Sequence, residues 1–390
     1  MKNGWQQKQI GDLCEVIAGQ SPDGKFYNSE GKGMPFYQGK KDFGEKFIET
    51  PTAWTTKTTK IAEKGDILMS VRAPVGPVNF ATEEVCIGRG LAAIRSGAEL
   101  DRNFLFYQLL HLQPEIAGRE GAVFASINKS EIEALPLVFA PRAEQKRIVG
   151  ILNEAFESIA TAKANTEKNL QNARDLFESH LQSVFTQRGK GWMERPLGNL
   201  ATFRNGINYT KDSKGERIKI VGVRNFQKHF SAPLDDLDTV TIDGELSELD
   251  LLKQDDILAV RSNGNIELIG RCLLVGKVTD KISHSGFTIR IRLAPGEVLP
   301  GYLCHFMKSA STRKRLAEGG TGTNIKSLNQ GMLSDLAIPF PAVPAQKLIV
   351  ERLEGLSAET QRLSLMYEQK LSELDELKKS LLSQAFSGQL

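Results

Sequence analysis

The chain has 390 residues, of which 40% are hydrophobic and 25% are charged. At about 150 residues per domain, this length predicts two or three domains, and the composition excludes a disordered chain, a collagen-like chain and a small disulfide-stapled fold. Fifty basic against 47 acidic residues give a net charge of +3. Taken alone, this balance predicts no polyanionic partner, because DNA-binding modules are often strongly basic. No apolar run is long enough for a membrane span or a signal peptide, so we expect no membrane association and a cytoplasmic location.

Two stretches, 1–140 and 191–340, are rich in Gly, Pro, Asn and Thr and carry short β-branched or aromatic runs. This composition predicts two loop-rich α+β domains. Within them we expect a strand at 67–71, helices at 104–112 and 302–309, and a half-buried strand at 287–292, where apolar and polar residues alternate.

Two other stretches are predicted to be long helices. Residues 142–188 contain no proline, and apolar or small side chains recur there at steps of three and four residues. The same pattern runs through residues 345–385, and Pro141 and Pro344 stand just ahead of the two stretches, where proline is tolerated at a helix start. Each helix is expected to have about 45 residues and a length of about 65 Å.

A lone helix of this length would expose its apolar stripe to water. Since about twelve turns exceed what one domain covers, we expect the two helices to pair antiparallel as a coiled coil. The predicted fold is a pseudo-twofold dumbbell, in which the helix pair separates and holds two α+β domains. The alternative is that each helix packs on its own domain.

The chain is an internal duplication. Gly-Trp at 4–5 recurs at 191–192 with an offset of 187 residues, and Gln-Lys at 145–146 recurs at 346–347 with an offset of 201. Many further matches occur in the same order, which predicts two copies of about 190 residues. The expected parts are a first domain at 1–140, a central helix at 141–190, a second domain at 191–340 and a C-terminal helix at 341–390.

The sequence contains no convincing catalytic constellation. The glycine-rich stretch 319–326 lacks the spacing of a P-loop and is interpreted as a flexible loop, with contact between its amides and a phosphate as the alternative. Asp23, Glu30 and Lys32 superficially resemble a nuclease's metal-binding residues, but they lie in one loop at short spacing. The five histidines form no paired motif, and the four scattered cysteines are expected to be buried free thiols that bind no metal.

Loops with Arg, Lys, Gln and Asn beside glycine recur in both domains. These side chains read base edges with two hydrogen bonds, and glycine lets the backbone approach a ligand closely. Arg72 follows Asp66 by six residues and Arg261 follows Asp256 by five, so we expect the two arginines to occupy parallel places. For any one residue the alternative is a turn or a solvated surface. The candidate DNA-binding residues are Gln38, Lys40, Lys41, Arg72 and Arg89 in the first domain, and Arg224, Asn225, Arg261, Asn263, Asn265 and Arg271 in the second.

Six segments carry specific motifs: Lys-Gly-Asp-Ile-Leu at 64–68, Val-Arg-Ala-Pro-Val-Gly at 71–76, Ile-Gly-Arg-Gly-Leu at 87–91, Glu-Gln-Lys-Arg-Ile-Val at 144–149, Arg-Ser-Asn-Gly-Asn at 261–265 and Leu-Leu-Ser-Gln-Ala-Phe-Ser-Gly at 381–388. With these motifs the chain resembles, over its entire length, the specificity subunits of type I restriction-modification systems. It departs from the family pattern in the linkers, where the first copy has Leu-Val-Phe-Ala-Pro at 137–141 and Glu144 stands where the second copy has Ala345.

The resemblance implies that each domain reads one half of an asymmetric, bipartite site on double-stranded DNA. It implies that the helix pair sets the spacer and docks two methyltransferase (modification) subunits, and that restriction subunits join the full complex. The chain itself would then be no enzyme and bind no cofactor, and S-adenosylmethionine, ATP and magnesium would belong to the partners. Two rivals stay open: a two-headed adaptor for protein or glycan ligands, and a nuclease that uses Asp23, Glu30 and Lys32.

The charge is spread evenly along the chain. The four expected parts carry net charges of −1, +2, +3 and −1 in chain order, so none is strongly basic. Any basic surface is therefore expected on one face of each domain. We expect the isolated chain to bind DNA weakly, with much of the phosphate contact supplied by the partner subunits.

Overall fold

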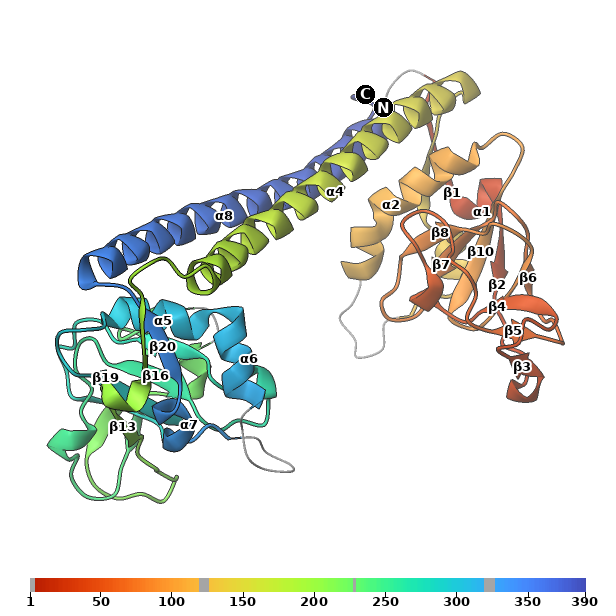
Figure 1. Cartoon of the computed structure of the whole chain (residues 1–390). Coiled ribbons are helices and arrows are strands. Elements are labelled where there is room, and N and C mark those ends of the chain that lie inside the picture. The colour runs from red at the N-terminus through yellow and green to blue at the C-terminus, as the bar shows by residue number, and fades with distance from the viewer. Residues whose placement is uncertain (1–3, 119–125, 227–228, 319–326) are drawn as a thin grey trace. The chain divides into compact units, whose positions relative to one another are not determined.

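The computed structural model describes residues 4–118, 126–226, 229–318 and 327–390. The chain divides into two units: the first combines Met1–Glu167 with Gln369–Leu390, and the second is Lys168–Glu368. Each unit therefore holds one globular repeat together with one stretch of each long helix (Figure 1).

Two larger sheets form the described globular part of the first unit. One is antiparallel with the strand order β2-β10-β7-β8, and the other is mixed with the order β3-β5-β4-β9-β6. The ribbon β1-β11 joins the start of the repeat to its end. The elements are β1 (Gln6–Gln9), α1 (Ile10–Leu13), β2 (Cys14–Ala18), β3 (Tyr27–Asn28), β4 (Met34–Tyr37), β5 (Trp54–Thr55), β6 (Ile61–Ala62), β7 (Ile67–Ser70), β8 (Val78–Phe80), β9 (Val85–Ile87), β10 (Leu91–Ser96), α2 (Arg102–Gly118), α3 (Lys129–Glu133) and β11 (Pro136–Phe139).

The described globular part of the second unit repeats this plan. Its antiparallel sheet has the order β13-β19-β16-β17, its mixed sheet has the order β15-β14-β18, and the ribbon is β12-β20. The elements are β12 (Met193–Pro196), β13 (Ala201–Asn205), β14 (Arg217–Val221), β15 (Asp238–Thr241), β16 (Ile257–Val260), β17 (Cys272–Leu274), β18 (Ile282–His284), β19 (Thr288–Leu293), α5 (Pro300–Lys308), α6 (Ala310–Glu318), α7 (Gln330–Ser334) and β20 (Ala337–Phe340).

The matching topologies confirm the duplication. In the first unit β10 pairs with β2 and β7, and in the second β19 pairs with β13 and β16. Each mixed sheet contains one parallel pair, β4 with β9 and β14 with β18. The strand predicted at 67–71 and the helices predicted at 104–112 and 302–309 are confirmed as β7, α2 and α5.

The strand predicted at 287–292 is present as β19, but its expected half-burial is wrong. Thr288 and Arg290 are both buried, although the alternation placed them on a solvated face. One terminal nitrogen of the Arg290 guanidinium donates to the backbone carbonyls of Leu249 (2.8 Å) and Leu251 (3.3 Å), while its Nε has no hydrogen-bond partner among the described residues. The two hydrogen bonds offset part of the cost of taking this polar group out of water.

Both long helices have the predicted length. Helix α4 spans Arg142–Thr186 and helix α8 spans Val343–Ser387, with 45 residues each. Pro141 stands just ahead of α4, as expected, whereas Pro344 is the second residue of α8. Proline is tolerated there because the first amides of a helix have no acceptor within it.

In the first unit, the start of α4 and the end of α8 enter the same core. Ile148 and Leu152 of α4 pack in one cluster with Ala385 and Phe386 of α8. The ring of Phe386 meets the ring of Phe104 edge-on, with 5.4 Å between their centroids. The first globular part therefore buries apolar residues from both long helices.

The second unit uses the opposite ends of the helices. Leu181 and Phe185 of α4 share a core with Leu353 of α8, and the ring of Phe185 lies 5.4 Å from that of Tyr302. Each helix thus packs on a globular part in both units. The expectation of helix pairing and the alternative of packing on a domain both describe part of the structure.

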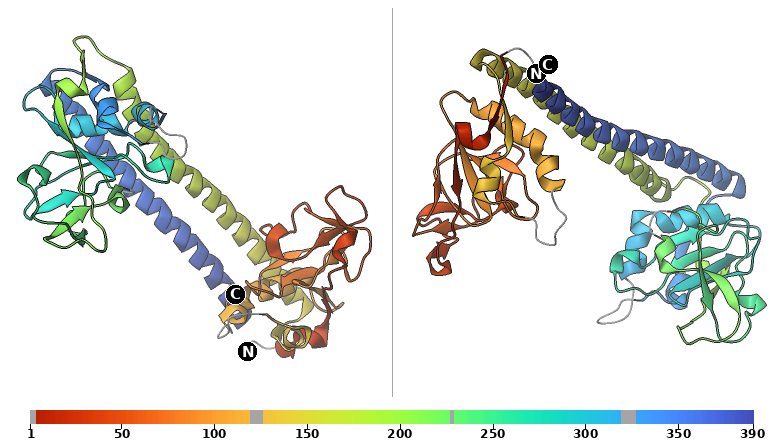
Figure 2. Two further views of the ribbon diagram at one scale, coloured as in Figure 1. Left: turned by 90° about the horizontal axis from the view of Figure 1, so that it is seen from below. Right: turned by 180° about the vertical axis from the view of Figure 1, so that it is seen from behind.

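Within each unit the two helix stretches run antiparallel, as predicted (Figures 1 and 2). Lys163 of α4 pairs with Asp375 of α8 in the first unit, and Arg174 lies 3.0 Å from Glu368 in the second. Exposed ion pairs of this kind contribute about 0.2–1 kcal/mol each. The helix pairing therefore depends mainly on the apolar stripes.

A buried glutamine joins the start of α4 to the first globular part. Gln145 is fully buried, and its side-chain oxygen accepts a hydrogen bond from the Asp101 amide at 2.7 Å. Its side-chain nitrogen donates to the carbonyls of Glu99 (3.1 Å) and Ala140 (2.8 Å). This single amide satisfies three backbone groups at the point where the helix begins.

Gln346 repeats the arrangement at the start of α8. Its side-chain oxygen accepts from the Leu299 amide at 2.9 Å, and its nitrogen donates to the carbonyls of Glu297 (2.7 Å) and Pro341 (2.8 Å). The Gln-Lys dipeptide that revealed the duplication is therefore a structural joint between helix and domain.

The Asp-Ile-Leu motif is also structural. Asp66 is buried and forms a double hydrogen bond with Arg95, at 3.0 and 2.9 Å. Asp256 forms the same pair with Arg292, at 2.6 and 2.7 Å. Removing one partner of such a pair costs about 3–5 kcal/mol, because the other charge stays buried. The motif holds the central strands of each antiparallel sheet in register.

Two histidines are buried in the second unit. Burial, together with the neighbouring charge of Arg290, lowers the pKa of His284 to about 3. Burial also lowers the pKa of His305 to about 4, with Lys308 acting in the same direction. By contrast, His180 on α4 is exposed. None of the described helices is both long and apolar enough to cross a membrane.

Replacing Gln346 with leucine should lower the free energy of unfolding by about 3 kcal/mol, because three buried backbone groups lose their partner. Urea unfolding at constant pH measures the change. Gln369→Leu on the exposed face of α8 is the matched control and should change stability by less than about 0.5 kcal/mol. Equal effects of the two substitutions would contradict the structural role of the joint.

Lowering the pH should destabilise the second unit through His305. This histidine is protonated in the unfolded chain below pH 6.5 but stays neutral in the folded state down to about pH 4. Its contribution is therefore present above pH 6.5 and is lost as the pH falls, by about 2–3 kcal/mol at pH 4.5. In His305→Phe, urea unfolding at pH 7.5 and 4.5 should show a correspondingly smaller loss. The exposed His180→Asn variant should keep the wild-type pH dependence.

Candidate nucleic-acid interface

Backbone hydrogen bonds in the first unit bring three predicted loops together. The Gly90 amide donates to the Gln38 carbonyl (3.1 Å), and the Val71 amide donates to the Gly90 carbonyl (2.9 Å). A Cβ atom on Gly90 would lie 2.3 Å from the Gln38 carbonyl oxygen, so glycine permits this close approach. The loops that carry Gln38, Arg72 and Arg89 therefore meet at one edge of the sheets.

The side chains predicted to bind DNA in the first unit are all exposed. Besides Gln38, they are the cations Lys40, Lys41, Arg72 and Arg89. These four cations form no ion pair with the part of the chain that the structure describes. Their charges are available to phosphate groups, which supply most of the affinity in protein–DNA contacts.

The corresponding surface of the second unit contains a hollow of about 380 Å³. It is lined by Arg224, Asn263, Tyr209 and Phe287, among others. The Arg224 guanidinium lies 2.6 Å from the carboxylate of Asp238, which orients it and balances its charge. Phe287 is 59% exposed. An arginine, an amide and two rings around one hollow can contact both the polar edge and the apolar face of a base.

Sequence reasoning missed Tyr209 and Phe287. Phe287 was assigned to an alternating strand, but it precedes β19 and lies in the turn after β18. Its carbonyl accepts the Arg261 amide at 2.9 Å, so the turn is tied to the loop that carries the predicted arginine. The aromatic residue next to Ser285-Gly286 was the available signal, because a turn presents its side chains to solvent.

The asparagines of the second unit hold the local backbone. Asn225 is 5% exposed, and its side-chain oxygen accepts the Gly222 amide at 2.9 Å. The side-chain oxygens of Asn263 and Asn265 accept amides two residues further on, at 2.8 and 2.9 Å. The turn-forming alternative therefore describes all three local conformations. The burial of Asn225 makes it a residue that positions the adjacent Arg224 loop.

The expected parallel between Arg72 and Arg261 is wrong by one residue. The Ile127 amide donates to the Val71 carbonyl (3.1 Å), and the Leu328 amide donates to the Arg261 carbonyl (2.8 Å). Val71 is thus the residue that matches Arg261, and the unequal spacing from the Asp-Ile-Leu motif is real. Arg72 is exposed, whereas Arg261 is partly buried.

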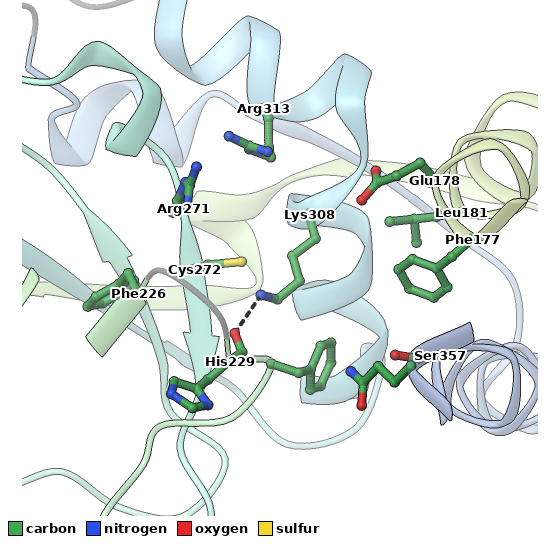
Figure 3. Close-up of a pocket in the computed structure, with 12 residues that line it drawn as sticks. Phe177, Glu178, Leu181, Phe226, His229, Arg271, Cys272, Lys308, Arg313 and Ser357 are labelled. Atoms are coloured by element: carbon green, nitrogen blue, oxygen red, sulfur yellow. Dashed lines mark hydrogen bonds between the residues drawn. The ribbon is translucent and has the colours of Figure 1, made fainter. Parts of the chain in front are cut away.

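Arg271 does not line the hollow of Arg224 and Asn263. It lines a different hollow, together with Lys308 and Arg313 (Figure 3). Its Nε donates to the carbonyl of Glu267 at 3.0 Å. The structure therefore separates two groups of cations that the sequence placed in one candidate set.

The hypothesis of a nuclease site has no geometric support. Lys32 forms an exposed ion pair with Glu30 at 2.6 Å, and no three potential metal-binding side chains lie together among the described residues. The glycine-rich stretch 319–326, considered as a loop with a possible phosphate contact, lies outside the described residues.

The four cysteines are free, but they are not all buried. Cys14 is partly exposed, while Cys86, Cys272 and Cys304 are buried. The sulfur atoms of Cys272 and Cys304 lie 4.0 Å apart. The sequence carried no signal for this neighbourhood, because only the contact between β17 and α5 brings the two residues together.

Comparison with known proteins places the chain in a family. A family model described as the type I restriction modification DNA specificity domain matches residues 2–172 and 189–366, one match on each repeat. The MjaX specificity subunit of Methanocaldococcus jannaschii is 40% identical over 174 residues, which cover 44% of this chain and 40% of that protein. The type I restriction enzyme EcoKI specificity subunit of Escherichia coli is 24% identical over 290 residues, or 69% of this chain and 61% of that protein. The chain thus spans less than two thirds of either relative.

Solved structures agree with this fold. A chain from a structure on complex assembly and conformational transition of the type I R-M system matches with a TM-score of 0.83 and 14% identity, over 100% of this chain and 99% of that chain. The HsdS subunit from Thermoanaerobacter tengcongensis matches with a TM-score of 0.62 and 14% identity, over 100% and 98%. At this level of identity the matches show the fold alone.

The family model matches both repeats and most of the chain, and the fold agrees with it in each unit. The chain therefore belongs to the type I restriction-modification specificity subunits, with two copies of the DNA specificity domain.

Proposed function

We propose that this chain is the DNA recognition subunit of a type I restriction-modification complex and that it has no catalytic activity of its own. Each globular part reads one half of an asymmetric, bipartite sequence in double-stranded DNA. The observation that carries the proposal is that one domain occurs twice with different loop residues. Two different reading surfaces on one duplex specify two different half-sequences, as a symmetric dimer specifies two equal ones.

The parts of the chain take separate roles. Residues 1–140 and 191–340 recognise DNA, and residues 141–190 and 341–390 set the spacer between the half-sequences. Two features support this division: the exposed cations sit on the loops of the globular parts, and each buried glutamine fixes the start of a long helix to its own domain. A rigid joint is needed if helix length is to determine spacer length.

The chemistry of the complex belongs to other subunits. The helices dock two modification subunits that transfer the methyl group of S-adenosylmethionine, and restriction subunits that use ATP and magnesium join the complete complex. The complex acts on DNA in the cytoplasm. Because no part of the chain is strongly basic, partner subunits supply much of the phosphate contact, and the isolated chain binds DNA weakly.

Within the globular parts, the residues proposed to contact DNA are not equivalent. Arg72 and Arg89 with Gln38, Lys40 and Lys41 form the first reading surface. In the second, Arg224 and Asn263 with Arg261 and Asn265 surround the hollow and its adjoining loop, and Tyr209 and Phe287 add apolar contact. Asn225 positions this loop, and Arg271 acts at a separate place.

Replacing Arg89 with alanine should change one half of the methylated sequence and leave the other half unchanged. The loss of an arginine contact to a base costs about 1–3 kcal/mol of discrimination at that position. The chain would be co-expressed with its modification subunits, and methylated bases would be mapped by single-molecule sequencing.

The matched control is Lys64→Ala, an exposed cation of the same domain outside the three loops. It should leave both half-sequences as in the wild type. A symmetric or undivided methylated sequence from the wild-type complex would contradict the proposal that two domains read two half-sequences.

Inserting four residues in each long helix should lengthen the spacer by one to two base pairs. One helical turn adds about 6 Å, which is close to two base steps of about 3.4 Å. The insertions belong after Glu167 in α4 and after Glu368 in α8, where the two units divide and the side chains are exposed. Both half-sequences should stay the same in the methylation map.

A four-residue insertion after Lys277, in the exposed loop between β17 and β18 of the second domain, is the control for added length. It should leave the spacer unchanged. An unchanged spacer in the double helix insertion would show that the helices do not set the distance between the half-sequences.

A further inference from the structure

A second hollow in the second unit is lined by basic side chains that the proposed base-reading surface does not use. It has a volume of about 280 Å³ and lies between the globular part and the local stretches of α4 and α8 (Figure 3). Its basic residues are Arg271 ahead of β17, Lys308 at the end of α5, and Arg313 on α6. Phe177 and Leu181 of α4 form an apolar wall opposite them.

Arg271 and Arg313 have one neutral acceptor in common. The Nε of Arg271 and a terminal nitrogen of Arg313 both donate to the backbone carbonyl of Glu267, at 3.0 and 3.3 Å. Two guanidinium groups that converge on one carbonyl repel each other unless an anion lies between or beside them. The arrangement is therefore suited to a ligand with negative charge and several acceptor atoms.

Arg313 and Lys308 have no carboxylate partner within ion-pair distance among the described residues. The Nε of Arg313 is buried and without a hydrogen-bond partner there. Lys308 donates to the carbonyl of His229 at 3.2 Å, and its ammonium group lies 5.3 Å from the centre of the Phe230 ring. These contacts hold the lysine in place, but they do not neutralise its charge.

The Cys272 thiol also lines the hollow. Its contact with Cys304 lowers its pKa, burial opposes this, and the charges of Lys308 and Arg313 lower the pKa further. Phe177 and Leu181 place apolar surface across from the cations, and a lower local dielectric strengthens the attraction of the cations for an anion. Glu178 is the acid among the lining residues, and it is exposed on α4 on the opposite side.

We propose that this basic hollow binds a phosphate group, held by Arg313 and Lys308 with Arg271 beside them. Phosphate fits the donor set because its oxygens accept from both a planar guanidinium fork and an ammonium group. The group comes either from a small phosphate compound or from the DNA backbone. The second source rests on the proposed function, whereas the first does not.

The first arm of the test uses the full chain and inorganic phosphate, measured by isothermal titration calorimetry at constant ionic strength. Arg313→Gln and Lys308→Gln should each weaken phosphate binding at least tenfold. Lys314→Gln is the matched control, since Lys314 lies on the same helix, is 74% exposed in its side chain and faces Glu318. It should bind within twofold of the wild type.

A variant that is expected to strengthen phosphate binding distinguishes a change in binding from a change in folding. Glu178→Gln removes the acid across the hollow from an exposed position, so it should tighten phosphate binding about twofold or more. Thermal unfolding of every variant checks that the second unit is intact. If Glu178→Gln alters binding in the same direction as Arg313→Gln, the hollow is not the site and the proposal is overturned.

The second arm measures DNA binding by the complex with its modification subunits over a range of salt concentrations. If the hollow contacts the DNA backbone, Arg313→Gln should remove about one phosphate contact. The slope of log affinity against log salt concentration should then fall by about one for every DNA sequence tested. If the chain binds inorganic phosphate but the salt dependence of DNA binding is unchanged in Arg313→Gln, the site takes a small phosphate compound. If the salt dependence falls but inorganic phosphate does not bind, the site takes a phosphate of DNA. Both outcomes support the phosphate site.

The proposal is overturned if the full chain binds no phosphate and Arg313→Gln leaves the salt dependence of DNA binding unchanged. Failure of the proposed function is a separate result. It would show as a wild-type complex that methylates no bipartite sequence, whatever the hollow binds.

Discussion

The two 45-residue helices each carry an apolar stripe that has to be kept from water, and the rest of the structure depends on how this is done. In each unit the start of one helix, the end of the other and a globular part share one core. Phe386 near the end of the chain packs on Phe104 of the first repeat, and Phe185 near the end of α4 packs on Tyr302 of the second. Each core therefore joins three distant segments, so neither globular part is independent of the helix pair.

This dependence explains why the most recognisable motifs are structural. Gln145 and Gln346 use every hydrogen-bonding atom of their amides on the backbone where a helix begins. The aspartates of the Asp-Ile-Leu motif are buried against arginines of the neighbouring strand. A buried amide or charge is costly unless its partners are in place, so these residues tolerate little change. The exposed loops between them are free to differ, and the two repeats differ there.

The candidate site was predictable as a set of loops and less so as individual residues. Glycines at Gly88 and Gly90 indicated a close backbone approach, and the structure packs them against the loop of Gln38. The roles of single polar residues were not predictable, because an asparagine in a turn has the same sequence signature whether its amide binds a base or its own backbone. Asn225 is buried and Arg271 faces a separate hollow. Both facts depend on which strand or helix packs over the residue.

The duplication, the α+β character of both repeats, and the length and amphipathic pattern of the helices could be predicted from the sequence, because they depend on local periodicity and ordered repetition. Long-range packing was needed to show that Val71 rather than Arg72 matches Arg261, that Phe287 is exposed beside Arg224, and that Arg313 and Lys308 line one hollow. Such neighbours are set by strand register and by helix packing between segments far apart in the chain. A shift of one residue turns a side chain to the opposite face, and no local pattern records it.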